Sequence, residues 1–180
     1  MNALLICLSN SWGGLEQVAA NDALDLGELG LKVQVICFEG SPIHQCLVRY
    51  PEIKLIPLNY KPRNILDFRL KNILRDLVEN QGINVIHTHQ PSLLGSIIPW
   101  VWRRPDLVVM ATRHIMNTHD KRDLIHRLLY QRLDAFVVVS QTIRQNVLAT
   151  HPLRERQVKV IHLGLDFDAF DPEKVDSRRQ

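Results

Sequence analysis

Short apolar runs alternate along the chain with segments in which apolar residues recur every three or four positions. An unbroken apolar run of this length is typical of a buried strand, and the wider spacing is typical of a helix with one buried face. The pattern predicts strands at 3–8, 32–38, 53–57, 84–87, 107–112, 135–139 and 158–161. It predicts helices at 15–29, 65–82, 91–102 and 124–133, and another after Ser140, a favourable N-cap residue.

The order of these elements predicts the fold class. The strands are rich in Val, Ile and Leu with little polar alternation, as expected for parallel strands that are covered on both faces. Strand and helix follow each other repeatedly, so we predict an α/β, Rossmann-like, doubly wound domain with a mostly parallel sheet and helices on both faces. Ligands bind beyond the carboxyl ends of the strands in such sheets. The residues that follow each strand are therefore the candidates for a functional site.

Composition narrows the class of protein. The 180 residues correspond to one domain by size, and 46% hydrophobic with 23% charged residues excludes a disordered chain. A net charge of +3 is no nucleic-acid signature, so we expect no nucleic-acid partner. Three cysteines argue against a disulfide framework and for a reduced, cytoplasmic protein. No apolar run reaches the 18 residues typical of a spanning helix, and the run at 3–8 indicates a strand rather than a signal peptide.

The turn after the first predicted strand contains Gly13 and Gly14, followed by a helix. Helix N-termini bind phosphate through backbone N–H groups, and glycine lets the phosphate approach. The alternative is a tight turn that needs glycine only for its backbone angles. The spacing does not match the dinucleotide fingerprint, because the glycines are adjacent and Gln17 stands where a later glycine would sit. Glu39, at the end of the second strand, is nevertheless placed as an acid that binds a ribose would be.

Histidines follow two of the later strands. His87 and His89 are two positions apart on a strand, so their side chains should share a face. No cysteine or carboxylate stands near them in the sequence, so we expect no metal site there. A structural pair and a ligand-facing role for His89 both remain open. Arg113 and His114 follow the next strand and suit an anionic or sugar ligand, although a single histidine is more often structural.

Two basic stretches accompany apolar stripes. One surrounds the helix predicted at 124–133, and a basic amphipathic helix can lie on an anionic membrane. The same pattern arises when a helix covers a sheet and keeps its charges in solvent, and we favour this second interpretation. The basic residues are Lys121, Arg122, Arg127 and Arg132 in the first stretch, and Lys61, Arg63, Arg69, Lys71 and Arg75 in the second.

Five segments, taken in order, resemble one family. They are Gly13-Gly14-x-Glu16, Val85-Ile86-His87-Thr88-His89, Ala111-Thr112-Arg113-His114, Val137-Val138-Val139-Ser140 and Val160-Ile161-His162-Leu163-Gly164-Leu165-Asp166-x-x-x-Phe170-x-Pro172. Their order and spacing resemble the N-terminal half of GT-B glycosyltransferases of the GT4 type, a large retaining family. The resemblance spans nearly the whole chain. It departs from the family pattern at His162-Leu163-Gly164, where Pro-Asn-Gly is usual, and at Gln141, where an acid is usual.

The resemblance implies a domain arrangement and roles for individual residues. Residues 1–163 would form the Rossmann-like, acceptor-binding N-terminal domain, and 164–180 would begin the interdomain linker. The donor-binding C-terminal domain, a partner within the same protein, is absent from this sequence. Gly13 and Gly14 would approach the donor diphosphate, and His114 would reach the transferring sugar as the catalytic residue. The acceptor side would comprise Glu16, His89, Gln90 and Arg113.

The resemblance also implies an activity. It is transfer of a hexose or related sugar, with retention, from a nucleotide-sugar co-substrate to a cell-envelope, lipid-linked or polysaccharide acceptor. No metal or other cofactor takes part. The enzyme would be cytoplasmic, held at the inner membrane surface if the basic stretches bind anionic lipid, and this half alone would be inactive. The alternatives are a nucleotide- or NAD-binding oxidoreductase domain, which Glu39 favours, and a non-catalytic membrane- or partner-binding module, which the basic stretches favour.

Overall fold

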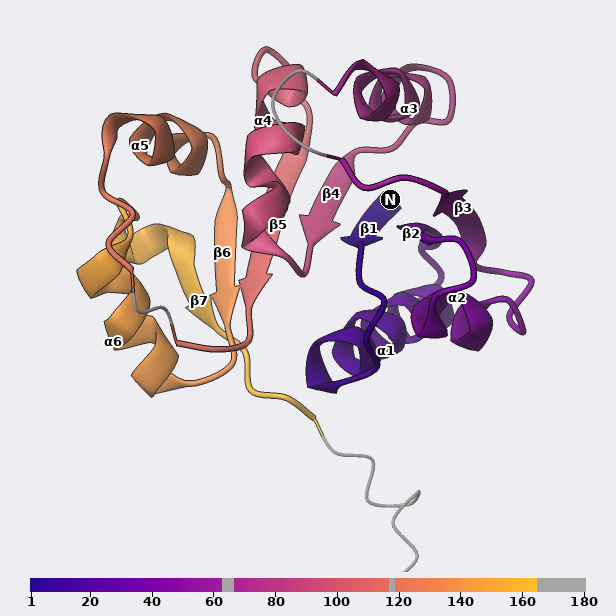
Figure 1. Ribbon diagram of the computed structural model, residues 1–180, viewed down its shortest axis with the longest axis horizontal. Coiled ribbons are helices and arrows are strands. Elements are labelled where there is room, and N and C mark those ends of the chain that lie inside the picture. The colour runs from indigo at the N-terminus through magenta and orange to yellow at the C-terminus, as the bar shows by residue number, and fades with distance from the viewer. Residues whose placement is uncertain (63–66, 117–118, 165–180) are drawn as a thin grey trace, which may run out of the picture.

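The computed structural model describes residues 1–62, 67–116 and 119–164, and its elements match the predicted ones closely (Figure 1). The expected linker lies outside the described residues from 165 onward. The strands are β1 (Asn2–Cys7), β2 (Lys32–Phe38), β3 (Lys54–Leu58), β4 (Val85–Thr88), β5 (Val108–Arg113), β6 (Ala135–Val138) and β7 (Val158–Val160). The helices are α1 (Gly14–Glu28), α2 (Pro42–Leu47), α3 (Phe68–Glu79), α4 (Leu94–Val101), α5 (Leu124–Gln131) and α6 (Gln141–Thr150), with short 3₁₀ turns at Pro91–Leu93 and Glu155–Gln157.

The strands form one parallel sheet in the order β3-β2-β1-β4-β5-β6-β7. Every neighbouring pair is parallel, and the chain reverses its direction of winding between β1 and β4, where Leu5 pairs with His87. This topology confirms the predicted doubly wound fold. A crevice forms where the strand order reverses, because successive connections leave the sheet in opposite directions there. The ends of β1 and β4 are therefore the natural place for a ligand.

The helices are unevenly shared between the two faces of the sheet. One core cluster joins α3, α4 and α6 to alternate strand residues such as Leu4 and Ile6. The other joins α1 and α2 to the intervening residues Leu5 and Cys7. Figure 1 shows α1 and α2 together beside β1 and β2. Beside α1, an open groove of about 710 Å³ extends over the strands from β1 to β6 and is closed at one side by residues 161–164.

Local sequence fixes the helix ends. Ser140 caps α6 as predicted, because its hydroxyl oxygen accepts a hydrogen bond from the Ile143 N–H at 3.2 Å. Asp123 caps α5 in the same way, accepting from the N–H groups of Ile125 and His126 at 3.1 Å. Cys7 and Cys37 are buried free thiols. Among the described helices, none combines the length and apolarity needed to cross a bilayer.

The expectation that the apolar stripe of α5 covers the sheet is wrong for most of that helix. Leu124, Ile125 and Leu128 are 73%, 68% and 48% exposed, respectively. Tyr130 is the buried residue of α5, and Leu133 is buried just after its end. The helix is short, so one turn of it reaches the core and the rest presents apolar side chains to solvent.

Candidate functional site

The glycine turn lies beyond the carboxyl end of β1, where Gly13 is the N-cap of α1. Neither Gly13 nor Gly14 has a positive φ, so the backbone does not require glycine at these positions. A Cβ at Gly14 would meet no atom within 4 Å. The tight-turn alternative therefore loses its physical basis, and the turn leaves open space at the positive end of a fifteen-residue helix.

Glu16 holds this turn in place. Its carboxylate is buried and accepts a hydrogen bond from the Gly13 N–H at 2.8 Å. Burial alone would raise the pKa of Glu16, but hydrogen bonds from Ser9 and Gly13, together with nearby His114, lower it below its ordinary value. The side chain is thus an anion that is already engaged by the turn. Its assignment to the acceptor side stays a prediction, and the observed contacts indicate a positioning role.

Three histidines from the ends of β4 and β5 form a row beside the turn. The ring centroids of His87 and His89 are 4.4 Å apart, so the two side chains share a face as predicted. The ring of His114 lies nearly parallel to that of His89, at 5.7 Å and 18°. The histidine row and the glycine turn both lie at the carboxyl ends of the strands. The candidate residues of the loops after β1, β4 and β5 therefore lie close together there.

Burial favours the neutral form of all three histidines in this row. Burial, followed by the neighbouring imidazoles, lowers the pKa of His87 to about 4 and that of His89 to about 2. Burial also lowers the pKa of His114, although Glu16 opposes the shift. The Nε2 atom of His114 is buried with no hydrogen-bond partner in the described part of the chain. A neutral imidazole with an unpaired nitrogen can still donate or accept one hydrogen bond.

The side chains of Gln90 and Arg113 bond to backbone groups of the loops at this edge of the sheet. The Gln90 amide accepts a hydrogen bond from the Leu8 N–H at 2.7 Å and donates one to the Leu8 carbonyl at 3.0 Å. The Arg113 guanidinium donates to the carbonyls of Ile115, at 2.9 Å, and Met116, at 3.4 Å. Gln90 thereby joins the loop after β4 to the end of β1, and Arg113 shapes the loop after β5. A direct contact of either residue with an acceptor stays a prediction.

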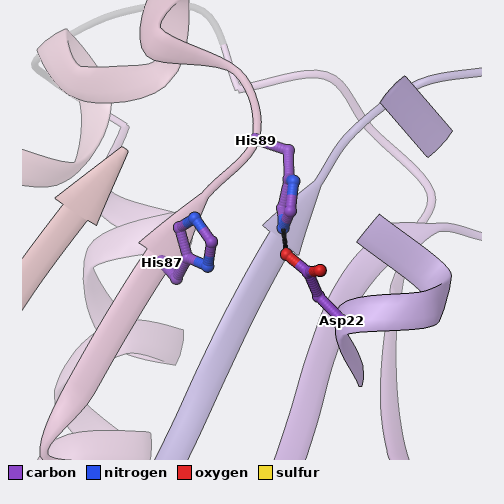
Figure 2. Close-up of side chains that lie close together, drawn as sticks. All are labelled: Asp22, His87 and His89. Carbon is purple, nitrogen blue, oxygen red and sulfur yellow. Dashed lines mark ion pairs between the residues drawn. The ribbon is translucent and has the colours of Figure 1, made fainter. Parts of the chain in front are cut away.

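Sequence reasoning missed Asp22, which Figure 2 shows facing His89 from α1. The Asp22 Oδ2 and His89 Nε2 atoms are 3.6 Å apart. Burial, and secondarily Asp25, raises the pKa of Asp22 to about 6. The available signal was the position of Asp22 in the helix, since it falls at helical spacing from Val18 and Ala19 on the face that packs inward.

Comparisons with known proteins identify the family and the fold. Residues 12–169 match the profile of Glycosyltransferase Family 4. A glycosyltransferase from Rickettsia africae superposes with a TM-score of 0.76 at 20% identity, over 98% of this chain and 48% of that one. The Anabaena protein HepE, solved with UDP and glucose, gives 0.64 at 17% identity, over 98% and 49%. The lipopolysaccharide outer core galactosyltransferase WaaB gives 0.63 at 13% identity, over 91% and 46%.

These similarities concern the fold, because each identity is below 25%. The chain spans about half the length of each of these solved structures. No curated protein matches it significantly.

Proposed function

The chain belongs to glycosyltransferase family 4, and from this premise we propose that it is the acceptor-side half of a retaining GT-B glycosyltransferase. The observation that carries the proposal is the open helix N-terminus at Gly14, next to a row of neutral histidines at the point where the strand order reverses. The partner is a C-terminal domain that binds the nucleotide. Membership of this family argues against the oxidoreductase alternative that Glu39 suggested.

The glycine turn would receive the donor diphosphate. Leaving-group charge grows on the diphosphate as the sugar bond breaks, and oriented N–H groups at a helix N-terminus stabilise such charge without reorganising. Gly13 and Gly14 present no side chain that would keep the phosphate away. Glu16 would contribute indirectly, because its carboxylate fixes the Gly13 N–H and so the shape of the turn.

His114 would contact the transferring sugar. Its unpaired Nε2 is suited to one hydrogen bond with a sugar hydroxyl, and the ring stacks beside His89 near the charge of Glu16. This contact would orient the sugar for front-face displacement with retention. The chemistry would need the nucleotide-sugar co-substrate and no other cofactor. His89, Gln90 and Arg113 would shape the acceptor side through the loops that they fix.

The acceptor would be a cell-envelope, lipid-linked or polysaccharide chain, reached at the cytoplasmic face of the membrane. Support comes from the exposed apolar side chains of α5, which stand beside Arg122 and Arg127. Apolar side chains with basic neighbours bind anionic bilayers. We expect Ile125→Ser to abolish flotation of the chain with anionic liposomes. Val48→Ser, an exposed apolar residue after α2, is the matched control and should leave flotation unchanged.

Enzyme assays test the function itself. The protein translated from the natural reading frame, supplied with nucleotide-sugars and a membrane lipid extract, should release nucleoside diphosphate and label a lipid or glycan with retention. Residues 1–180 alone should not. Turnover by residues 1–180 would contradict the assignment of this chain to an incomplete half, and hydride transfer to a nicotinamide would restore the oxidoreductase alternative.

A further inference from the structure

Asp22, His87 and His89 converge on one point between α1 and the end of β4 (Figure 2). We propose that these three side chains bind a transition-metal ion, with Zn²⁺ as the best match. One ligand atom from each residue lies within 4.8 Å of the others, and His89 Nε2 and Asp22 Oδ2 are 3.6 Å apart. Ligands on a tetrahedral zinc ion stand roughly 3.3 Å apart. One edge of the site is therefore nearly at its final length, and side-chain rotation would close the others.

The second observation is the unsatisfied state of His89. Its side chain is 0% exposed, and both ring nitrogens lack a hydrogen-bond partner among the described residues. The separation of 3.6 Å from Asp22 is too long for a hydrogen bond. Leaving buried polar atoms unpaired is costly. An ion between His89 and Asp22 would satisfy Nε2 and the carboxylate together.

His87 is already oriented as a metal ligand would be. Its Nε2 atom is 2.7 Å from the Thr112 hydroxyl oxygen, which leaves Nδ1 as the nitrogen that could meet the ion. Histidine ligands in metal sites are commonly held through their other ring nitrogen in this manner. Histidine coordinates a metal ion through an unprotonated ring nitrogen, which Nδ1 of His87 can supply.

The donor set selects the class of ion and shows how it would enter. Two imidazoles and one carboxylate suit Zn²⁺ and neighbouring transition metals, whereas Mg²⁺ and Ca²⁺ prefer oxygen ligands alone. Asp22 and His87 both line the 710 Å³ groove, which gives the ion a route in and space for a water molecule as fourth ligand. A bound ion would tie α1 to the end of β4. It would thus fix the helix that carries the glycine turn, without taking part in sugar transfer.

Metal titration of residues 1–180, without a polyhistidine tag and after chelator treatment, tests the proposal. We expect one equivalent of Zn²⁺ to bind by calorimetry, and Co²⁺ to give the visible bands of a four-coordinate site. Asp22→Asn and His89→Gln should each weaken binding by about 10- to 100-fold. Asp25→Asn is the matched control, because it removes a carboxylate of the same helix that lines the same groove outside the three-residue cluster. This variant should bind as the parent does.

Folding of each variant is checked by circular dichroism in the presence of chelator. Should His89→Gln fail to fold, Asp22→Asn decides alone, because Asp22 is 38% exposed and the substitution conserves shape. Zn²⁺ should also raise the melting temperature of the parent and not that of Asp22→Asn. Absence of saturable Zn²⁺ and Co²⁺ binding would overturn the proposal. Equal binding by the parent and Asp22→Asn would also overturn it, because the ion would then occupy other histidines.

Discussion

His89 and His151 are both buried histidines with an unpaired ring nitrogen, yet their surroundings differ. His151 follows α6, where its Nδ1 is 2.9 Å from the Thr150 hydroxyl oxygen and its ring meets Tyr130 edge-on at 5.2 Å. His89 has neither ring nitrogen paired, and it stacks beside His114 near the glycine turn. Burial lowers the pKa of both residues, so a depressed pKa does not separate them. Their neighbours do separate them, since the ring of His151 packs against core aromatic side chains and the ring of His89 stacks beside His114 in the candidate site.

The strongest test of this contrast replaces a histidine from each region in the whole protein. His114→Ala should lower kcat by about 10²–10⁴-fold if the side chain assists transfer in the way that positioned acid–base groups do. His151→Gln should leave kcat within about twofold, because that ring packs against Tyr130 and Phe136 in the core. Both variants are assayed at saturating donor, after their melting temperatures are recorded. Equal kcat values for His114→Ala and the parent would remove His114 from the reaction.

A substitution in the glycine turn should have a smaller effect, and it should change stability and donor binding in opposite directions. Gly14→Ala should raise the free energy of unfolding by about 0.4–1 kcal/mol, because alanine restricts the unfolded chain and its Cβ meets nothing in the folded one. The same methyl group would crowd a diphosphate, so we expect the KM for the donor to rise about tenfold, equivalent to about 1.4 kcal/mol of binding.

Gly95→Ala is the matched control for this substitution. Gly95 also lies in the first turn of a helix, α4, and a Cβ there also meets no atom within 4 Å. It should show the gain in stability without the change in KM. A rise in KM for both variants would indicate a general effect on the fold, and a rise for neither would show that the diphosphate does not approach Gly14.

Local patterns made much of the fold predictable. Apolar spacing locates the strands and helices, and the hydroxyl of Ser140 identifies the start of α6. The two-residue spacing of His87 and His89 placed their rings on one face, and the observed rings are 4.4 Å apart. These features depend on residues that are close in the sequence. Strand and helix geometry alone therefore determines them.

The contacts that define the candidate site depend on segments far apart in the sequence. Asp22 and His89 are 67 positions apart in the sequence, and Gln90 is 82 positions from Leu8, whose backbone it hydrogen-bonds. Only the pairing of β1 with β4 brings these residues together. The absence of a carboxylate near the histidines in the sequence predicted no metal site there, whereas the folded chain brings the carboxylate of Asp22 from α1 beside them.

The smallest expected effect is a dependence of stability on pH that belongs to His151. In the folded chain, the pKa of His151 is lowered to about 4, chiefly by burial. The nearby charges of Lys121, Arg113 and His126 contribute to the lowered pKa, and Asp120 opposes the shift. In the unfolded chain the ordinary pKa of about 6.5 applies. As pH falls from 7 to 5.5, the unfolded state gains a proton that the folded state does not, so stability declines by about 1 kcal/mol. Urea unfolding of the parent and His151→Gln at both values of pH measures this, and the decline should be smaller in the variant by that amount. If the free energy of unfolding declined equally in the parent and in His151→Gln, the proton would bind another group. His151 would then be a packed ring whose titration does not affect folding.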